Sequence, residues 1–391
     1  MATPTGDAGN SQQPKQYTLR QTEDSLTPNI HEVTAEIEQD RPRVAPGILS
    51  RAERTRLAER AFLGLYRWYT ERSQTLRNWS PDRDIEWRSA RRDPSPEVVA
   101  ILQGFFAVEQ YTPDYVGQIM KLVRPSHGRS QYLLRWGAEE EKHSDLWRNA
   151  LLFTRARSRE WLEEYMGSLR NSEWTVGWED PLRMLFYQII QERATQVNYL
   201  NFGLLVKGET VTDGDVTRPN PHHDPVLQHA ARTIAIDEGA HYDFFLETAR
   251  VFLYYFPVES LEALADVLKH FAMPAMDIIP DYDQFGEAIY RTAIYGPREY
   301  SKDVVQVALG KLGIEGRKAL ENGVRLSRQV PEADGRMRDT ALFGSLDYGY
   351  IEDAVTRLFT RIHRYEAKYG LDQVAPTEFV RTCPPLGPDR A

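Results

Sequence analysis

Cysteine and long apolar runs are both scarce in this sequence. Its 391 residues contain one cysteine, Cys383, which can form no internal disulfide bond and fits a reducing compartment. The longest apolar stretches, such as residues 251–256, are far too short to cross a bilayer. Residues 1–16 are small and polar, unlike the apolar segment of a signal peptide. These absences argue against a disulfide framework and against a membrane span, and they predict a cytoplasmic protein.

Net positive charge is lacking as well. The chain has 48 Lys and Arg against 57 Asp and Glu, a net charge of −9, whereas nucleic-acid binding needs clustered cations with little acid nearby. We therefore expect no nucleic-acid partner. Arginine is locally dense over residues 51–92, which makes this stretch a candidate surface for an anionic partner. The interleaved Glu53 and Glu59 equally fit an ordinary solvated helix.

Strand signals are nearly absent, and apolar residues recur instead at spacings of three and four. The sequence predicts an all-α fold. Residues 1–45 are rich in Gly, Ser, Gln and Pro and are expected to form a flexible N-terminal arm. The expected helices cover residues 50–75, 95–122, 128–155, 158–170, 180–207, 224–256, 259–270, 282–294, 300–311, 315–328 and 345–368.

Two helix starts carry clear signals. Ser95 and Asp224 are each followed by proline, which is the pattern of an N-cap residue before proline at the first helical position. The polar, Pro- and Gly-punctuated segment 208–225 is expected to be a loop between two helices.

The motif Glu-x-x-His occurs twice, at Glu140–His143 and at Glu238–His241. One such match by chance would be unremarkable in a chain with nine histidines. Helical periodicity, however, places both motifs on the buried faces of their helices, between apolar residues. Each motif therefore points a carboxylate and an imidazole into the core, where they need hydrogen bonds, opposite charge or metal.

Two further carboxylates lie on otherwise apolar helical runs, Glu109 and Glu192. In chain order the pattern is a Glu followed by Glu-x-x-His, written twice. Four carboxylates facing one another would repel strongly at low dielectric, and two divalent metal ions would restore neutrality. This arrangement resembles that of ferritin-like di-iron and di-manganese carboxylate proteins, which build the site in a four-helix bundle. Oxygen-rich ligation with one nitrogen per metal suits iron, with manganese possible.

Acidic residues directly precede each motif. Glu139 and Asp237 are both placed to accept the outer ring N–H of the histidine on the opposite helix. For Glu139, which lies in a run of three glutamates, a solvated helix face is an equally good interpretation.

The motifs together resemble those of the soluble acyl-ACP desaturases, the stearoyl-ACP desaturase type with a ferritin-like diiron core. The resemblance covers about residues 50–330. The segments that carry it are 108–115 (VEQYTPDY), 136–146 (WGAEEEKHSDL), 186–195 (FYQIIQERAT), 234–241 (IAIDEGAH) and 273–275 (MPA). It implies a ferritin-like diiron desaturase domain over residues 46–330, followed by a C-terminal helical extension and tail over residues 331–391.

The resemblance also implies an activity, a cofactor and partners. Two iron ions would be held by Glu109, Glu140, His143, Glu192, Glu238 and His241. The reaction would be O2-dependent desaturation of a saturated acyl chain on acyl carrier protein, with ferredoxin as electron donor and a homodimer as the assembly. The arginine-dense stretch 51–92 would then dock the acidic carrier.

Three further residues match functional positions of that family. Thr195, one turn after Glu192, would lie on the oxygen-binding side of the pocket and relay a proton. Trp79 and Asp237 would form an electron path from the surface to His143, although a buried tryptophan is often plain packing. The chain departs from the family at Gly239-Ala240, where basic residues are usual, and in the longer loop 208–225.

Other diiron proteins use similar ligands. A ribonucleotide reductase radical subunit needs a tyrosine about one turn beyond the first motif's histidine, where this chain has Trp147. Iron-storage proteins are usually much shorter and assemble into cages. A diiron hydroxylase or N-oxygenase remains the main alternative, because dehydrogenation and oxygen insertion differ in substrate placement rather than in ligands.

Overall fold

The computed structural model describes residues 51–326, 329–331, 337–339 and 343–374, and this part of the chain is overwhelmingly helical. The all-α prediction is confirmed. The helices are α3 (Arg51–Leu76), α4 (Pro96–Glu109), α5 (Thr112–Val123), α6 (His127–Phe153), α7 (Arg159–Leu169), α8 (Pro181–Leu205), α9 (Pro225–Tyr255), α10 (Pro257–His270), α11 (Tyr282–Arg291), α12 (Pro297–Glu299), α13 (Gln306–Lys311), α14 (Arg317–Leu326), α15 (Tyr348–Lys368) and α16 (Leu371–Val374). Shorter elements are η2 (Trp87–Ser89), the π-helical η3 (Tyr300–Val305), η4 (Phe343–Ser345), and the strand pairs β1 (Thr210–Asp213) with β2 (Val216–Pro219) and β3 (Gln329–Pro331) with β4 (Met337–Asp339).

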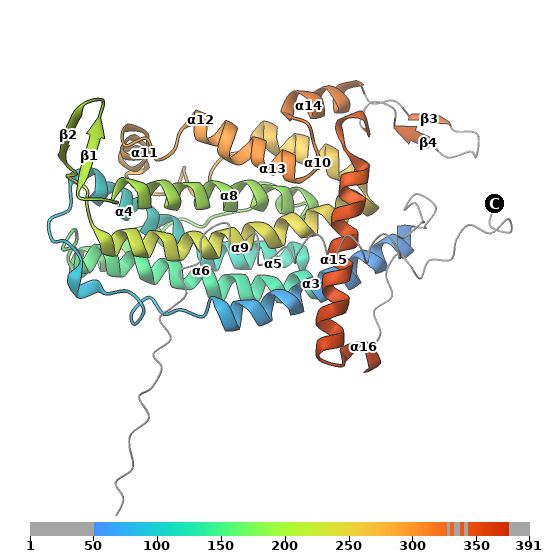
Figure 1. Cartoon of the computed structure of the whole chain (residues 1–391), viewed down its shortest axis with the longest axis horizontal. Helices are drawn as coiled ribbons and strands as arrows, with labels where there is room; N and C mark the ends of the chain where they lie inside the picture. The colour runs from blue at the N-terminus through green and yellow to red at the C-terminus, as the bar shows by residue number, and fades with distance from the viewer. Residues whose placement is uncertain (1–50, 327–328, 332–336, 340–342, 375–391) are drawn as a thin grey trace, which may run out of the picture.

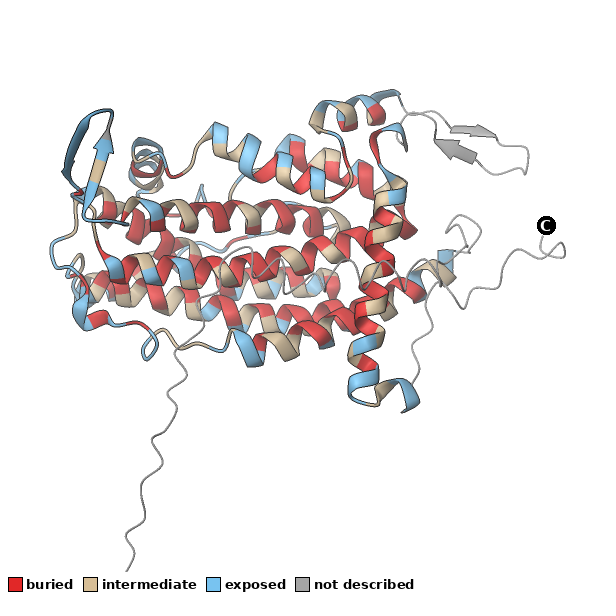
Figure 2. Ribbon diagram, viewed as in Figure 1, coloured by how far each residue is buried: buried red, intermediate tan, exposed pale blue. Residues whose placement is uncertain are grey.

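Four long helices, α4, α6, α8 and α9, form the centre of the molecule. Helix α8 packs along α9, α4 packs along α6, and α6 also contacts α9 (Figure 1). Helix α3 covers α6 and α9 on one side, and α10 and α11 cover α8 and α4 on the other. Buried residues follow the facing sides of these helices (Figure 2). The result is a four-helix bundle whose interior can hold buried ligands.

The predicted caps explain where two bundle helices begin. The Ser95 side chain accepts a hydrogen bond from the Val98 backbone N–H at 3.3 Å, and Pro96 occupies the first position of α4. Asp224 accepts from the backbone N–H groups of Val226 and Leu227 at 2.9 and 3.1 Å at the start of α9. Both caps satisfy N–H groups that have no partner within their own helix.

The prediction of one helix over residues 95–122 is wrong. Helix α4 ends at Glu109 and α5 begins at Thr112. Pro113 has no N–H group to donate to the Glu109 carbonyl, and the Thr112 hydroxyl donates to that carbonyl instead, at 2.9 Å. Glu109 is therefore the last residue of its helix.

The segment 208–225 is not simply a loop. Strands β1 and β2 pair antiparallel, and Gly214 in the connecting turn has a φ of +58°, which glycine adopts without strain. The two turn residues are Gly214 and Asp215, and a two-residue turn that begins with glycine is a hairpin signal that explains the difference. All four residues of β2 are exposed, so the hairpin projects from one end of the bundle (Figure 1).

Helix α15 lies within the predicted C-terminal extension and crosses α3 and α9 (Figure 1). The Arg361 guanidinium lies 3.3 Å from the Glu247 carboxylate of α9 and 4.4 Å from the centre of the Trp68 ring of α3. This helix therefore closes one end of the bundle. The predicted arm over residues 1–45 lies outside the described residues. Among the described helices, none has the length and apolarity to cross a bilayer.

Candidate metal centre

The bundle brings all six predicted ligand residues together in its interior. Each is at most 5% exposed. Their carboxylate oxygens and ring nitrogens fall into two groups, and within each group the atoms lie within 4.8 Å of one another. The first group is Glu109, Glu140, His143 and Glu238, and the second is Glu140, Glu192, Glu238 and His241.

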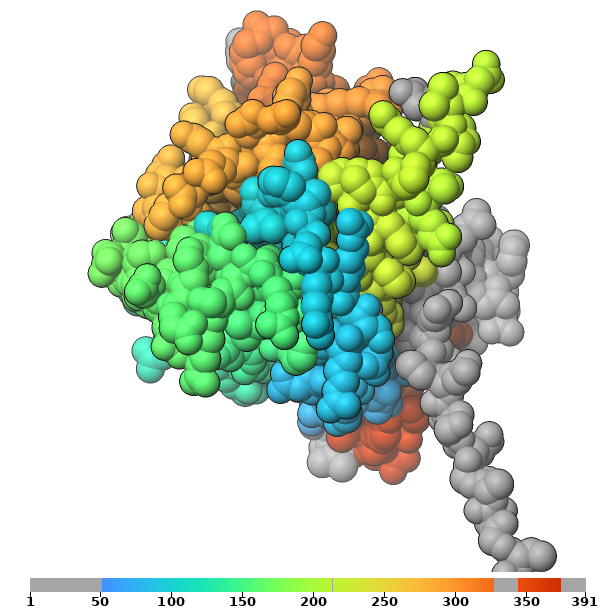
Figure 3. All heavy atoms as spheres, turned by 90° about the vertical axis from the view of Figure 1, so that its left-hand side faces the viewer, coloured from blue at the N-terminus to red at the C-terminus, as the bar shows by residue number. Residues whose placement is uncertain are grey.

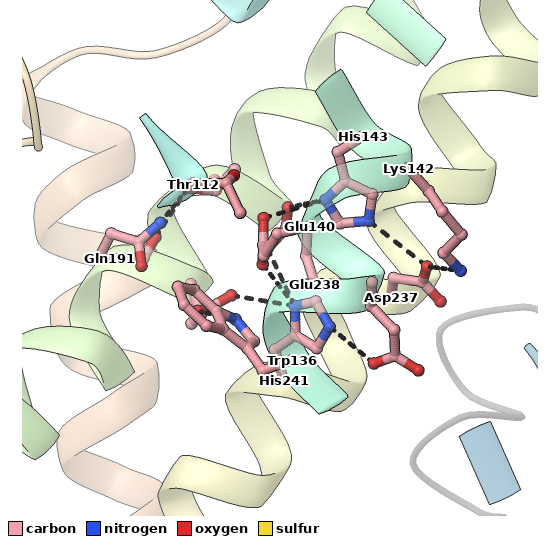
Figure 4. A network of polar contacts seen from close by, with 12 residues as sticks. Thr112, Trp136, Glu140, Lys142, His143, Gln191, Asp237, Glu238 and His241 are labelled. Carbon is pink, nitrogen blue, oxygen red and sulfur yellow. Dashed lines mark hydrogen bonds and ion pairs between the residues drawn. The ribbon is translucent and has the colours of Figure 1, made fainter. Parts of the chain in front are cut away.

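Glu140 and Glu238 belong to both groups and lie between the two histidines (Figure 4). The two oxygens of Glu140 face different rings, at 3.2 Å from His143 Nδ1 and 3.0 Å from His241 Nδ1. Glu238 does the same, at 3.2 and 3.8 Å. Two carboxylates that each face both imidazoles are arranged to bridge a pair of cations, with Glu109 and Glu192 at the outer ends.

Several inward-facing polar atoms have no hydrogen-bond partner among the residues that the structure describes. They are Nδ1 of both histidines, both carboxylate oxygens of Glu238, and Oε2 of Glu192. Buried polar atoms are normally satisfied, since each unsatisfied one costs about 1–3 kcal/mol. Lone-pair donors that converge on the same small volume fit divalent metal ions with mixed oxygen and nitrogen ligands.

The outer nitrogen of each histidine contacts a second carboxylate. His241 Nε2 donates to Glu139 at 3.0 Å, and His143 Nε2 lies 3.4 Å from Asp237 Oδ2. These are the contacts that the sequence predicts, and Glu139 is fully buried rather than on a solvated face. A carboxylate on Nε2–H holds the proton there and leaves Nδ1 as the metal-facing lone pair.

Arg77 links Glu139 and Asp237, the carboxylates that contact the two histidines from behind. Its guanidinium lies 3.5 Å from Glu139 and 3.4 Å from Asp237, and its side chain is only 9% exposed. The Tyr69 and Ser73 hydroxyls of α3 also donate to Glu139. One buried cation thus offsets the charge of the carboxylates that orient both histidines.

Trp79 and Lys142 complete the Asp237 side of this layer. The Trp79 indole N–H donates to Asp237 Oδ2 at 2.8 Å, and Lys142 Nζ donates to the same oxygen at 3.2 Å. The Trp79 ring is stacked parallel to the His143 ring, with centroids 6.2 Å apart. Trp79 is half-buried, so its indole connects Asp237 and His143 to the surface.

Thr195 is buried on α8, one turn beyond Glu192. Its hydroxyl donates to the Gln191 carbonyl at 3.0 Å and accepts from the Gln191 side-chain amide at 3.1 Å. In this arrangement its proton is held by the helix backbone, and among the described contacts the hydroxyl touches none of the six clustered residues.

Charge within the cluster is the strongest sign that it needs cations. Burial, and then the charge of neighbouring carboxylates, raises the pKa of Glu109 and of Glu192 well above the usual range. Burial alone would raise the pKa of Glu140 too, but the facing imidazoles hold it below its ordinary value. Without metal, therefore, protons must replace part of the missing positive charge.

Residues 83–341 match the protein family described as fatty acid desaturase. The chain belongs to this family. It is 24% identical over 256 residues to the putative acyl-[acyl-carrier-protein] desaturase DesA1 of Mycobacterium tuberculosis H37Rv, covering 60% of this chain and 70% of that protein. It is 27% identical over 249 residues to stearoyl-[acyl-carrier-protein] 9-desaturase 6 of Arabidopsis thaliana, covering 60% of each chain.

A further relative is palmitoyl-[acyl-carrier-protein] 4-desaturase 2 of Ophrys sphegodes, at 25% identity over 278 residues, 66% of this chain and 69% of that one. Among solved structures, the putative acyl-ACP desaturase DesA2 of M. tuberculosis H37Rv overlaps 65% of this chain and 96% of its own length. The TM-score is 0.43 and the sequence identity 19%.

Some residues around the centre of this desaturase were not predicted from its sequence. Arg77 was expected in a surface patch for an anionic partner, yet it is buried between Glu139 and Asp237. Two other arginines of this stretch also have partners within the chain. Arg51 pairs with Glu259, and Arg54 donates to the Tyr255 carbonyl.

Two of the clustered ligand residues, Glu192 and Glu109, each accept a hydrogen bond from an aromatic residue. The Trp136 indole N–H donates to Glu192 Oε1 at 3.0 Å, and the Tyr199 hydroxyl donates to Glu109 Oε1. Tyr199 was not singled out in the sequence. Tyr199 lies seven residues after Glu192, which is two turns along the same face of α8.

An open pocket of about 370 Å³ lies at one end of the desaturase. It is lined mainly by α4, by α11 and the segment leading into it, and by Tyr165 of α7. These segments meet on the face turned toward the viewer in Figure 3. Phe285 lines the pocket and contacts Phe105 edge-on at 5.7 Å between ring centres. Phe105 precedes Glu109 by one turn of α4, so the pocket approaches the candidate metal centre along that helix.

Proposed function

We propose that this chain is an O2-dependent diiron desaturase that introduces a cis double bond into a saturated acyl chain carried on acyl carrier protein. The observation that carries the proposal is the pair of overlapping ligand groups that share Glu140 and Glu238. Family membership supports it, and relatives from a bacterium and from two plants are named acyl-carrier-protein desaturases.

The proposed metals are two iron ions, with manganese as the alternative. Glu109 and His143 would hold one ion, Glu192 and His241 the other, and Glu140 and Glu238 would bridge them. When bound, the two ions supply the redox chemistry with O2 that removes hydrogen from an unactivated CH2 group. The chain's own part is to hold the ions, exclude water and place one carbon of the acyl chain beside them.

Trp79, Asp237 and His143 are the proposed route for electrons. The indole, the carboxylate and the imidazole are joined by contacts of 2.8 and 3.4 Å, and the indole is the member nearest the surface. Thr195 is the proposed proton relay. Its hydroxyl lies one turn from Glu192 and would have to turn away from the Gln191 carbonyl to donate.

The partners follow from the same proposal. The relatives' names support acyl carrier protein as the substrate carrier. Ferredoxin as electron donor and a homodimer remain predictions of the family resemblance. A cytoplasmic location remains a prediction from the sequence composition.

The proposal is tested by incubating iron-loaded protein with acyl carrier proteins bearing saturated chains of several lengths, a ferredoxin reducing system and O2. Mass spectrometry of the released acids should show the loss of two hydrogens from at least one chain. His241→Ala should abolish this product, whereas His270→Ala should retain it, because His270 is exposed on α10 and pairs with Asp266. Acids that gain one oxygen would instead identify a hydroxylase, and unchanged acids across the series would overturn the proposal.

A further inference from the structure

Tyr199 is a buried phenol in direct contact with one member of the ligand cluster. It is 1% exposed, and its hydroxyl donates across the bundle from α8 to the Glu109 carboxylate on α4. Hydrogen bonds between a neutral hydroxyl and a carboxylate are among the stronger ones in proteins, because the acceptor is charged. The phenol therefore restrains the Glu109 carboxylate at the C-terminal end of α4.

The ring of Tyr199 is itself held by two aromatic residues. Phe105 contacts it edge-on with ring centres 4.8 Å apart, and Trp147 contacts it at 5.4 Å. Phe105 and Trp147 also contact each other at 5.0 Å. All three rings are buried, and edge-on packing of this kind fixes ring orientation.

These three rings are built into the ligand helices themselves. Phe105 lies one turn before Glu109 on α4, Trp147 lies one turn after His143 on α6, and Tyr199 lies one turn after Thr195 on α8. A shift of any of the three helices would move the phenol relative to Glu109. The box of Phe105, Trp147 and Tyr199 is thus coupled to the geometry of the first ligand group.

Glu192, the corresponding carboxylate of the second ligand group, receives its hydrogen bond from a different residue. Glu192 Oε1 accepts a hydrogen bond from the Trp136 indole N–H. Its Oε2 lies 3.4 Å from His241 Nδ1 and has no hydrogen-bond partner in the described segments. Glu109 and Glu192 therefore each have one oxygen that accepts a hydrogen bond from an aromatic side chain. The donors come from different helices and serve different ligand groups.

We propose that Tyr199 is a positioning residue for Glu109, and that it selects which carboxylate oxygen faces the metal ion held with His143. Trp136 plays the matching part for Glu192 and the ion held with His241. The inference rests on the metal centre of the proposed function but not on its substrate or its reaction.

The test titrates metal-free protein with Co(II) alone, followed by calorimetry and by visible absorption of the bound ion. Wild type should bind two ions per chain. Tyr199→Phe should keep one site at wild-type affinity and weaken the other by about 10- to 100-fold, the usual effect of removing a hydrogen bond to a ligand. Trp136→Phe should also weaken one site, and the double variant should weaken both.

Tyr132→Phe is the matched control. This phenol is also buried, but within the described part of the chain its hydroxyl has no hydrogen-bond partner. Its removal should therefore leave both sites and the absorption spectrum unchanged. Thermal unfolding of the metal-free proteins should show that both Tyr→Phe variants fold. Should Tyr199→Phe fail to fold, Phe105→Leu replaces it, and weakening of one site is again the expected result.

Two results would overturn the inference while leaving the proposed function intact. One is a Tyr199→Phe protein, or its Phe105→Leu substitute, that binds both Co(II) ions like wild type. The other is a double variant that still keeps one site at full affinity, because the two donors would then serve the same ion. A wild-type chain that binds no Co(II), iron or manganese overturns the inference and the proposed function together.

Discussion

At the scale of single residues, function depends on what lies behind the ligands. Glu139 and Asp237 each contact the outer nitrogen of a histidine whose inner nitrogen faces the cluster. Burial alone would raise the pKa of Glu139, but its hydrogen bond with His241 and the Arg77 charge hold that pKa far below its usual range. The carboxylate is therefore ionised and fixes the imidazole proton on Nε2.

Glu139→Gln should weaken metal binding by about tenfold or more, because the amide keeps the shape but loses the charge that orients His241 and offsets Arg77. Calorimetric titration of the metal-free protein measures the effect. Glu141→Gln is the control, since Glu141 is exposed on the same helix. Equal metal affinities of the two variants would show that Glu139 has no such role.

Trp79→Phe should slow electron delivery severalfold without changing metal content, because the phenyl ring cannot donate to Asp237. The comparison is desaturation driven by ferredoxin against single-turnover reaction of protein reduced chemically beforehand. Only the first should fall. Trp161→Phe, which alters a half-buried indole on α7, should change neither rate, and an equal fall in both rates for Trp79→Phe would point to a packing role.

The ligand residues could be predicted because their evidence is local. Glu-x-x-His places two side chains on one helix face, and the apolar neighbours show that this face is buried. Arg77, Tyr69 and Tyr199 could not be assigned in this way. Their roles depend on which helices become neighbours, and a single sequence does not determine that.

At the scale of elements, the helix ends position the centre. The cap residue Asp224 is buried, and its second oxygen accepts a hydrogen bond from the Arg91 backbone N–H at 2.9 Å. It therefore fixes the start of α9, the helix that carries Glu238 and His241, and also attaches the segment before α4.

Asp224→Ala should lower the free energy of unfolding by about 2 kcal/mol, the upper range for loss of an N-cap, because three backbone N–H groups lose their acceptor. Urea unfolding measures it. Asp215→Ala, at an exposed position in the β1–β2 turn, should change stability by less than about 0.5 kcal/mol. Indistinguishable midpoints for the two variants would contradict this view of the cap.

Element boundaries were the least predictable part of the fold. The eleven expected helices correspond closely to the observed ones, except that Thr112-Pro113 ends α4 early. The expected loop 208–225 also differs, because the turn Gly214-Asp215 makes it a hairpin. Both exceptions had local sequence signals. The apolar pattern over residues 95–122 continues through the break, and it concealed the first of them.

At the scale of the whole molecule, the core contains four buried carboxylates whose negative charges repel one another. Metal binding should therefore stabilise the fold. At a free metal concentration of about 100 times the dissociation constant, the expected gain is roughly 2.7 kcal/mol for one ion. Thermal unfolding with and without a chelator measures this gain, and His241→Ala should lose most of it. Equal unfolding temperatures for the wild type in both conditions would contradict the expectation.

The fold class and the position of the centre follow from the sequence, whereas the closure of the bundle by α15 does not. That helix was predicted as a helix, but its packing across α3 and α9 depends on long-range contacts such as Arg361 with Glu247. One member of the predicted surface for an anionic partner differs for the same reason, because Arg77 turns inward, whereas Arg67, Arg88 and Arg92 of the same stretch are exposed.

The most direct test of the central claim is anomalous X-ray scattering at the iron edge from crystals of the iron-loaded protein. We expect two peaks inside the bundle, one beside Glu109 and His143 and the other beside Glu192 and His241, with Glu140 and Glu238 between them. Diffraction that shows no iron among these six side chains would contradict the account.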